Sequence, residues 1–205
     1  MSNHWLRALM LSLVPLAAGC EVLPDLRLGE DVGIPPVSGS TVVSVPQDYK
    51  CGDPITDPNG KYQVTSSGTQ ESCTFTFRQD VTAIAASDYD SIPQLEGAQA
   101  INGVELVVEK FAISDKATGK EPEGLKDAEG KAFGVTILTE EDLARDPPFT
   151  VLVDGAPLEE LKAQLQARQD IVIPLDVIVV VALDPAPPAE LQIDFDAQPV
   201  ITVGF

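Results

Sequence analysis

The chain has 205 residues, of which 13 are basic and 32 acidic, so its formal net charge at pH 7 is −19. A protein this negative repels phosphate groups, which argues against nucleic acid as a partner. The one histidine, His4, lies close to the N-terminus, so the rest of the chain lacks the residues for Ser-His-Asp catalysis, Cys-His catalysis or a histidine-ligated zinc site.

The first twenty residues have the layout of a secretory signal. Arg7 ends a short, positively charged start, residues 8–18 are almost entirely apolar, and small residues lead to Cys20. The apolar run is too short for a membrane span, which needs roughly 18 apolar residues or more. His4, Trp5 and both methionines lie inside this segment, so a mature chain without it has no histidine, tryptophan or methionine.

The sequence Leu16-Ala17-Ala18-Gly19-Cys20 resembles the lipobox of bacterial lipoproteins. In that family the signal peptide, residues 1–19 here, is removed, and the cysteine becomes the first mature residue and carries the lipid. The resemblance implies lipidation of Cys20, attachment to a membrane through that lipid, and a location in the cell envelope. Glu21 after the cysteine is compatible with sorting to the outer membrane of a diderm bacterium, as in enteric members of the family.

Residues 20–40 are rich in proline, glycine and acidic side chains and have little periodicity. This composition predicts a flexible tether, which would span roughly 25 Å between the lipid and the domain. The remaining residues, 41–205, are expected to form a single domain.

Two cysteines remain after Cys20, at positions 51 and 73. Because the compartment outside the inner membrane is oxidising, Cys51 and Cys73 are predicted to form one disulfide. Two thiols without a histidine or a further cysteine cannot complete the tetrahedral shell of a zinc site. Their spacing also differs from the Cys-x-x-Cys of redox proteins. We therefore expect a structural bridge.

Eight segments have the β-branched content or the alternation of β-strands. They are residues 41–45, 62–65, 73–85, 104–113, 133–138, 149–153, 171–183 and 191–205. Within 73–85 the apolar alternation changes phase, which predicts a bulge at Gln79 and Asp80. The polar, glycine-containing residues 115–131 are interpreted as a loop.

Two short helical segments are predicted between these strands. Thr139 is typical of an N-cap and three acidic residues follow it, which predicts one or two helical turns. Residues 157–169 begin with a proline and carry leucines at positions 158, 161 and 165. These leucines form one apolar stripe that can lie across an open end of a sheet.

The C-terminal segment 191–205 gives the clearest strand signal, because one of its faces is apolar throughout. The opposite face is polar and carries Gln192, Asp194, Asp196 and Gln198. Such a strand belongs to an antiparallel sheet with one solvated face and one face packed on a second layer. Segment 171–183 is apolar on both faces and is expected to be a central strand or to lie under the helix.

Together these elements predict a mainly β fold. We expect an antiparallel β-sandwich of Ig-like or Greek-key type, with about eight strands and one or two short helical insertions.

Carboxylates are the only abundant groups for chemistry in the predicted domain. Asp88 and Asp90 lie two residues apart after a strand, and Asp127 and Glu129 form a similar pair. Hard oxygen ligands in flexible loops suit Ca²⁺, so these four residues are the candidate Ca²⁺ ligands. No catalytic residue and no other cofactor is predicted.

We expect a membrane-tethered, non-enzymatic envelope lipoprotein that acts as a binding or structural module, with another protein of the envelope as its partner. The alternative is a carboxylate-dependent glycan hydrolase, which needs only two acidic residues, or a Ca²⁺-dependent glycan-binding module. Sugar sites usually stack rings on tryptophan or tyrosine, and the mature chain offers only Tyr49, Tyr62 and Tyr89 for this role.

Overall fold

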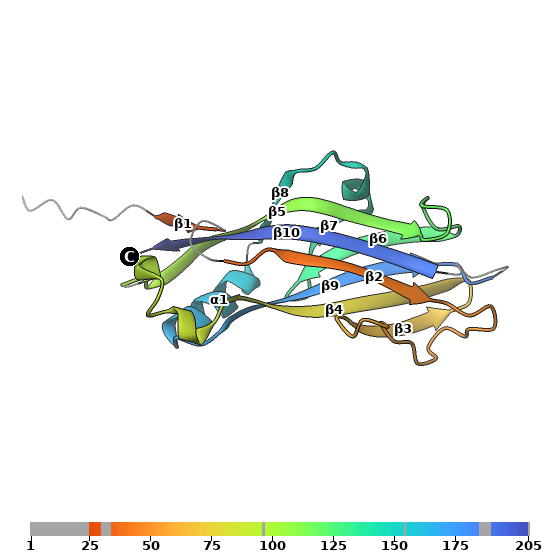
Figure 1. Ribbon diagram of the computed structural model, residues 1–205, viewed down its shortest axis with the longest axis horizontal. Coiled ribbons are helices and arrows are strands. Elements are labelled where there is room, and N and C mark those ends of the chain that lie inside the picture. Colours follow the sequence, from red (N-terminus) through yellow and green to blue (C-terminus); the bar gives the residue numbers. More distant parts are fainter. Residues whose placement is uncertain (1–24, 30–33, 96, 154, 185–189, 205) are drawn as a thin grey trace, which may run out of the picture.

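The computed structural model has two antiparallel β-sheets packed face to face (Figure 1). It describes residues 25–29, 34–95, 97–153, 155–184 and 190–204. The first sheet contains β1 (Leu26–Leu28), β2 (Val37–Ser44), β5 (Ala100–Asp115), β8 (Phe149–Val153) and β10 (Glu190–Gly204). The second contains β3 (Gln63–Thr69), β4 (Ser72–Ile84), β6 (Leu125–Ala132), β7 (Val135–Leu138) and β9 (Ile171–Val181). The predicted antiparallel β-sandwich is therefore confirmed.

The longest C-terminal strands lie at the centres of the two sheets. In the first sheet β10 pairs with β5 on one side, and on the other side β1 and β2 pair with its two ends. In the second sheet the order is β3-β4-β9-β6-β7, so β9 lies between β4 and β6. The central position predicted for segment 171–183 is confirmed, and it explains why both faces of that strand are apolar.

A single hydrophobic core fills the space between the sheets. Phe75 and Phe77 of β4 are fully buried, and they lie in the same core as Ile193 and Phe195 of β10. Phe195 also meets Phe111 of β5 edge to face, with ring centroids 6.3 Å apart. Burying a side chain of this size stabilises the fold by roughly 1.5–3 kcal/mol.

Helix α1 (Ala156–Gln166) lies at one end of the sandwich, where it contacts β5 of one sheet and β9 of the other (Figure 1). Leu161 and Leu165 are buried and Leu158 is half-buried, as the predicted stripe requires. The helix ends earlier than predicted because Arg168 has a φ of 51°, a left-handed conformation that cannot continue it. No helix in the described part of the chain has the length and apolar character of a membrane span.

The described residues include three short 3₁₀ turns, at Ala86–Asp88, Pro93–Leu95 and Glu140–Ala144. The last of them is the turn predicted after Thr139. The Thr139 backbone N–H donates to the Asp142 carboxylate at 2.8 Å, which fixes the start of this turn.

Residues 125–132 form strand β6, so the loop predicted for 115–131 is wrong in its second half. β6 pairs with β9 on one side and β7 on the other. Its inward residues are Ala128, Gly130 and Ala132, which are small and carry no apolar alternation that the sequence could reveal. Gly130 must be small because Leu138 packs directly over it, where an added Cβ would come within 3.0 Å.

The first sheet begins before residue 41, where the domain was expected to start, and includes part of the N-terminal segment. β1 lies wholly inside the segment interpreted as a tether, and β2 begins at Val37. Leu28 and Ile34 are buried in the core together with Val37. These isolated apolar residues have no periodicity, but each fills a place in the core, which holds the segment against β10.

The bulge predicted at Gln79 and Asp80 is also wrong. Both residues pair with β9 in continuous register, and the irregularity lies between Thr82 and Ile84. Val81 is an even number of residues from Phe77 and so keeps the alternation. The phase therefore changes only in the last step to Ile84.

Candidate functional site

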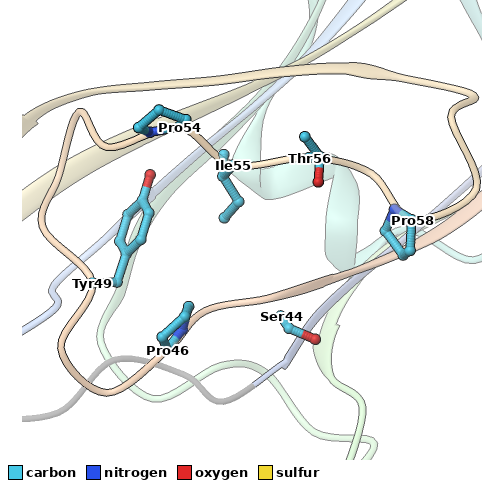
Figure 2. Close-up of a pocket in the computed structure, with 7 residues that line it drawn as sticks. All are labelled: Ser44, Pro46, Tyr49, Pro54, Ile55, Thr56 and Pro58. Atoms are coloured by element: carbon cyan, nitrogen blue, oxygen red, sulfur yellow. The ribbon is translucent and has the colours of Figure 1, made fainter.

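The connection between β2 and β3 forms a groove on the surface of the sandwich (Figure 2). It is lined by Ser44, Pro46, Tyr49, Pro54, Ile55, Thr56 and Pro58, and its volume is about 320 Å³. The lining comes from two segments, 44–49 and 54–58, that run opposite each other, and the Ile55 side chain points into the space between them (Figure 2). Three prolines stiffen these walls, because each fixes its own backbone φ.

Tyr49 forms one wall of the groove and is held on several sides. Its hydroxyl donates to the backbone carbonyl of Asp53 at 2.8 Å and is also hydrogen-bonded to Ser66 Oγ on β3. Its ring stacks on Phe75, with ring centroids 5.9 Å apart. Only 6 % of the residue is exposed, so the groove wall is continuous with the core.

The disulfide predicted between Cys51 and Cys73 is present and lies behind this wall. Cys73 belongs to β4 and is fully buried, whereas Cys51 belongs to the loop. Gln70 holds the backbone of the same loop. Its side-chain amide accepts from the Cys51 N–H at 2.7 Å and donates to the Tyr49 carbonyl at 3.0 Å. The bridge therefore does more than stabilise the fold, because it fixes the loop that shapes the groove.

Asp57 organises the other side of the loop. It is 7 % exposed, and its carboxylate accepts hydrogen bonds from the Thr41 hydroxyl and from the backbone N–H groups of Asn59, Lys61 and Tyr62. Burial by itself raises the pKa of Asp57, but these donors outweigh burial and hold the pKa below the ordinary value of 3.8. The charged carboxylate thus joins the loop to β2.

Tyr62 completes the loop as a packing residue. Its hydroxyl rests on Gly39 of β2, where an added Cβ would come within 1.7 Å of the oxygen. This buried hydroxyl has no hydrogen-bond partner among the described residues. Burial, together with the charge of Asp57, raises the pKa of Tyr62 to about 12, so the phenol is neutral near pH 7.

The four candidate Ca²⁺ ligands are engaged elsewhere or lie apart. The Asp88 carboxylate accepts from the Ala85 N–H at 3.3 Å, and Asp90 forms an ion pair with Arg168 at 2.7 Å. Asp127 and Glu129 lie in strand β6 and not in a loop.

Glu129 pairs with Lys131 at 2.7 Å and accepts from the Thr136 hydroxyl. Among the described residues, no three acidic, histidine or cysteine side chains gather as a metal-binding group. Cys20, the expected lipidation site, lies outside the residues that the structure describes.

The polar face of β10 is less solvated than predicted. Asp194 is only 6 % exposed, and Lys110 of the neighbouring β5 pairs with it at 2.7 Å. Burial alone raises the pKa of Asp194, but hydrogen bonds from Lys110, Ser40 and Gln192 outweigh it and lower that pKa. The residue is buried because β10 is central and the side chains of two flanking strands cover it.

The three tyrosines that a sugar site could have used are all buried. Tyr49 and Tyr62 belong to the groove loop, and Tyr89 donates to the Gln169 carbonyl at 2.9 Å beside α1. Each exposes less than a tenth of its surface, which is too little for the open ring face on which a sugar stacks.

The groove was not predicted from the sequence, although the prolines that stiffen its walls can be recognised there once the structure is known. Pro46, Pro54 and Pro58 surround Tyr49 and Cys51 within a short stretch, a combination that favours a stiff loop fixed to the core. The resulting surface is partly apolar, with hydroxyls from Ser44 and Thr56. Comparisons of the chain with family models, with curated proteins and with solved structures find no match in any of the three.

Proposed function

We propose that this chain is a membrane-tethered, non-enzymatic envelope lipoprotein whose groove binds a protein partner away from the membrane. The observation that carries the proposal is the separation of the groove from the N-terminal segment. Leu26 pairs with Val203 at one end of β10, and Ser44 pairs with Glu190 at the other. The thirteen residue steps from Glu190 to Val203 correspond to about 43 Å of β-strand, and Figure 1 has β1 and the β2–β3 loop at opposite ends.

The build of the groove supports binding. Its walls are fixed by prolines, a disulfide and the hydrogen bonds of Tyr49 and Asp57, so little ordering entropy is lost when a ligand enters. A volume of about 320 Å³ is at the small end of ligand sites. It suits one or two apolar side chains of a partner protein better than a whole cofactor.

No observation favours the alternative of a glycan hydrolase or a Ca²⁺-dependent glycan-binding module. The described tyrosines are buried. Of the candidate Ca²⁺ ligands, Asp90 and Glu129 form ion pairs, and Asp127 and Glu129 lie in a strand. We therefore propose that the chain is a protein-binding module.

A photo-crosslinking experiment in the native envelope tests the proposal. A crosslinking amino acid replaces the exposed Thr56 in the groove, and the control replaces Thr82, which is exposed on β4 outside it. We expect one discrete product from position 56 that is absent from position 82. Ile55→Asn should remove the product, and because the half-buried Ile55 also packs against the core, a cooperative melting curve must show that the variant is still folded. The same products from both positions, or a product that survives Ile55→Asn, would contradict a binding role for the groove.

A further inference from the structure

The end of the sandwich opposite the groove carries a second hollow. Its volume is about 290 Å³, and Leu152, Val153 and Leu158 supply apolar lining, while Asp25 and Glu105 stand among its polar residues. Leu152 is 68 % exposed, and with Val135 it is one of two large hydrophobic side chains exposed in the described part of the chain. Leu152 lines the same hollow as the half-buried Leu158, so its exposed side chain belongs to an apolar rim and does not stand alone.

The N-terminal segment is fixed at this hollow. The Asn102 side-chain amide donates to the Asp25 carboxylate at 2.8 Å, and Arg27 pairs with Glu105. Residues 26–28 also pair with β10 as β1. Both carboxylates at the hollow therefore have partners, and Asp25 is a fixed point on this end of the molecule.

The length of chain between Cys20 and Asp25 limits how far this end can move from the lipid. Five residues of fully extended chain reach at most about 18 Å. Since the inference rests on the proposed lipidation of Cys20, the hollow stays within that distance of the membrane anchor. The groove lies about 43 Å further along β10.

We propose that the end of the sandwich that carries Asp25 and Leu152 rests on the phospholipid bilayer, with Leu152 in contact with the headgroup region. A chain that begins at Cys20 has 12 basic and 32 acidic residues, and this net negative charge opposes an orientation that brings a large part of its surface against lipid phosphates. An end-on orientation places only a small surface on the bilayer, and the two carboxylates that line its hollow, Asp25 and Glu105, are paired with Asn102 and Arg27. The occupant of the hollow is therefore lipid.

The absence of tryptophan after residue 5 provides a clean test, because an introduced tryptophan is then the only one in the mature chain. Lipidated Leu152→Trp and Thr56→Trp proteins are each reconstituted into phosphatidylcholine vesicles with and without brominated acyl chains. Tryptophan emission from the Leu152→Trp protein should fall about twofold with brominated lipid, because an indole at the interface lies within reach of the quencher. Emission from the Thr56→Trp protein should not change. Thr150→Trp, on the same face of β8 but further from this end, should give an intermediate loss.

The outcomes separate this inference from the proposed function. If the proteins float with the vesicles but Leu152→Trp is quenched no more than Thr56→Trp, the bilayer contact is wrong while the tether stands. Stronger quenching of Thr56→Trp would reverse the proposed orientation. If the lipid-modified proteins fail to float at all, the tether itself is wrong, and the inference falls with it. Melting curves of all three variants should match that of the parent protein, because the substituted side chains are exposed.

Discussion

Asp57 is the residue on which the groove loop depends most. Asp57→Asn replaces one accepting oxygen by a nitrogen that cannot accept the surrounding N–H and O–H donors. We expect the free energy of unfolding to fall by about 1.5–3 kcal/mol, the range for hydrogen bonds to charged groups. Urea denaturation measures the loss. Asp48→Asn is the control, because Asp48 is exposed in the same loop and should change stability by no more than about 0.5 kcal/mol.

The same carboxylate makes stability depend on pH. Its folded-state pKa is lowered from the ordinary value of 3.8, so the unfolded chain takes up its proton first as the pH falls. The stabilisation is therefore present above about pH 3.8 and is lost as the pH falls through the lowered pKa. Urea melts between about pH 5 and pH 2 should show a shallower acid slope for Asp57→Asn than for the parent protein. Parallel slopes would mean that Asp57 does not carry this dependence.

Gly39 and Tyr62 give a second test at the scale of single residues. The Tyr62 hydroxyl is buried without a partner among the described residues, so Tyr62→Phe should leave stability unchanged or raise it by about 1 kcal/mol. Gly39→Ala should cost about 1–3 kcal/mol, because the new methyl group collides with that hydroxyl. The double variant should recover part of this loss, which denaturant melts of the three proteins would reveal. Strict additivity would contradict the contact.

The two faces of strand β10 differ, since one packs in the core and the other is polar but covered by side chains of the flanking strands. Phe195 is buried against Phe111, so Phe195→Ala should cost about 3–5 kcal/mol. Asp194, on the opposite face, is paired with Lys110, so Asp194→Asn should cost about 1–2 kcal/mol and not the near-zero change of a solvated residue. Denaturant melts at neutral pH compare the two. Equal losses, or none at Asp194, would contradict this arrangement of the strand.

The strands that the sequence predicted well are those whose side chains alternate strongly. β10 and β9 have long apolar series, and the central position of β9 follows from its series, whereas the covered polar face of β10 does not. β6 was missed because its inward residues are alanine and glycine, whose fit depends on Leu138 from another strand. Tertiary contacts of this kind leave no periodic signal in one sequence.

The groove was missed for a related reason. The disulfide was expected, but no sequence pattern indicated that two stretches of the loop between β2 and β3 face each other. Asp57 and Tyr49 bring them together through contacts with β2 and β3. Such long-range hydrogen bonds are set by the fold, so the shape of the groove becomes visible only in the structure.

At the scale of the whole molecule, the two ends of the sandwich differ in chemistry. One end carries the paired N-terminal segment and an exposed leucine, and the other carries a stiff groove fixed by a disulfide. The net negative charge of the chain disfavours contact with anionic surfaces. This polarity suits a protein that is held at one end and recognised at the other.

The tether gives the prediction for the whole molecule. The lipobox resemblance implies a lipid on Cys20, and several acyl chains bury far more CH₂ groups than the single chain whose membrane binding is only marginal. Cys20→Ser removes that anchor and leaves an acidic domain with no helix, among the residues described, that could span a membrane. We expect the variant to move from the membrane pellet to the soluble envelope or secreted fraction, as measured by immunoblotting after a high-salt wash. The control is the parent protein, which the same wash should leave in the pellet because salt weakens charge contacts and not acyl-chain insertion. A Cys20→Ser protein that still pellets would show that attachment does not depend on this cysteine.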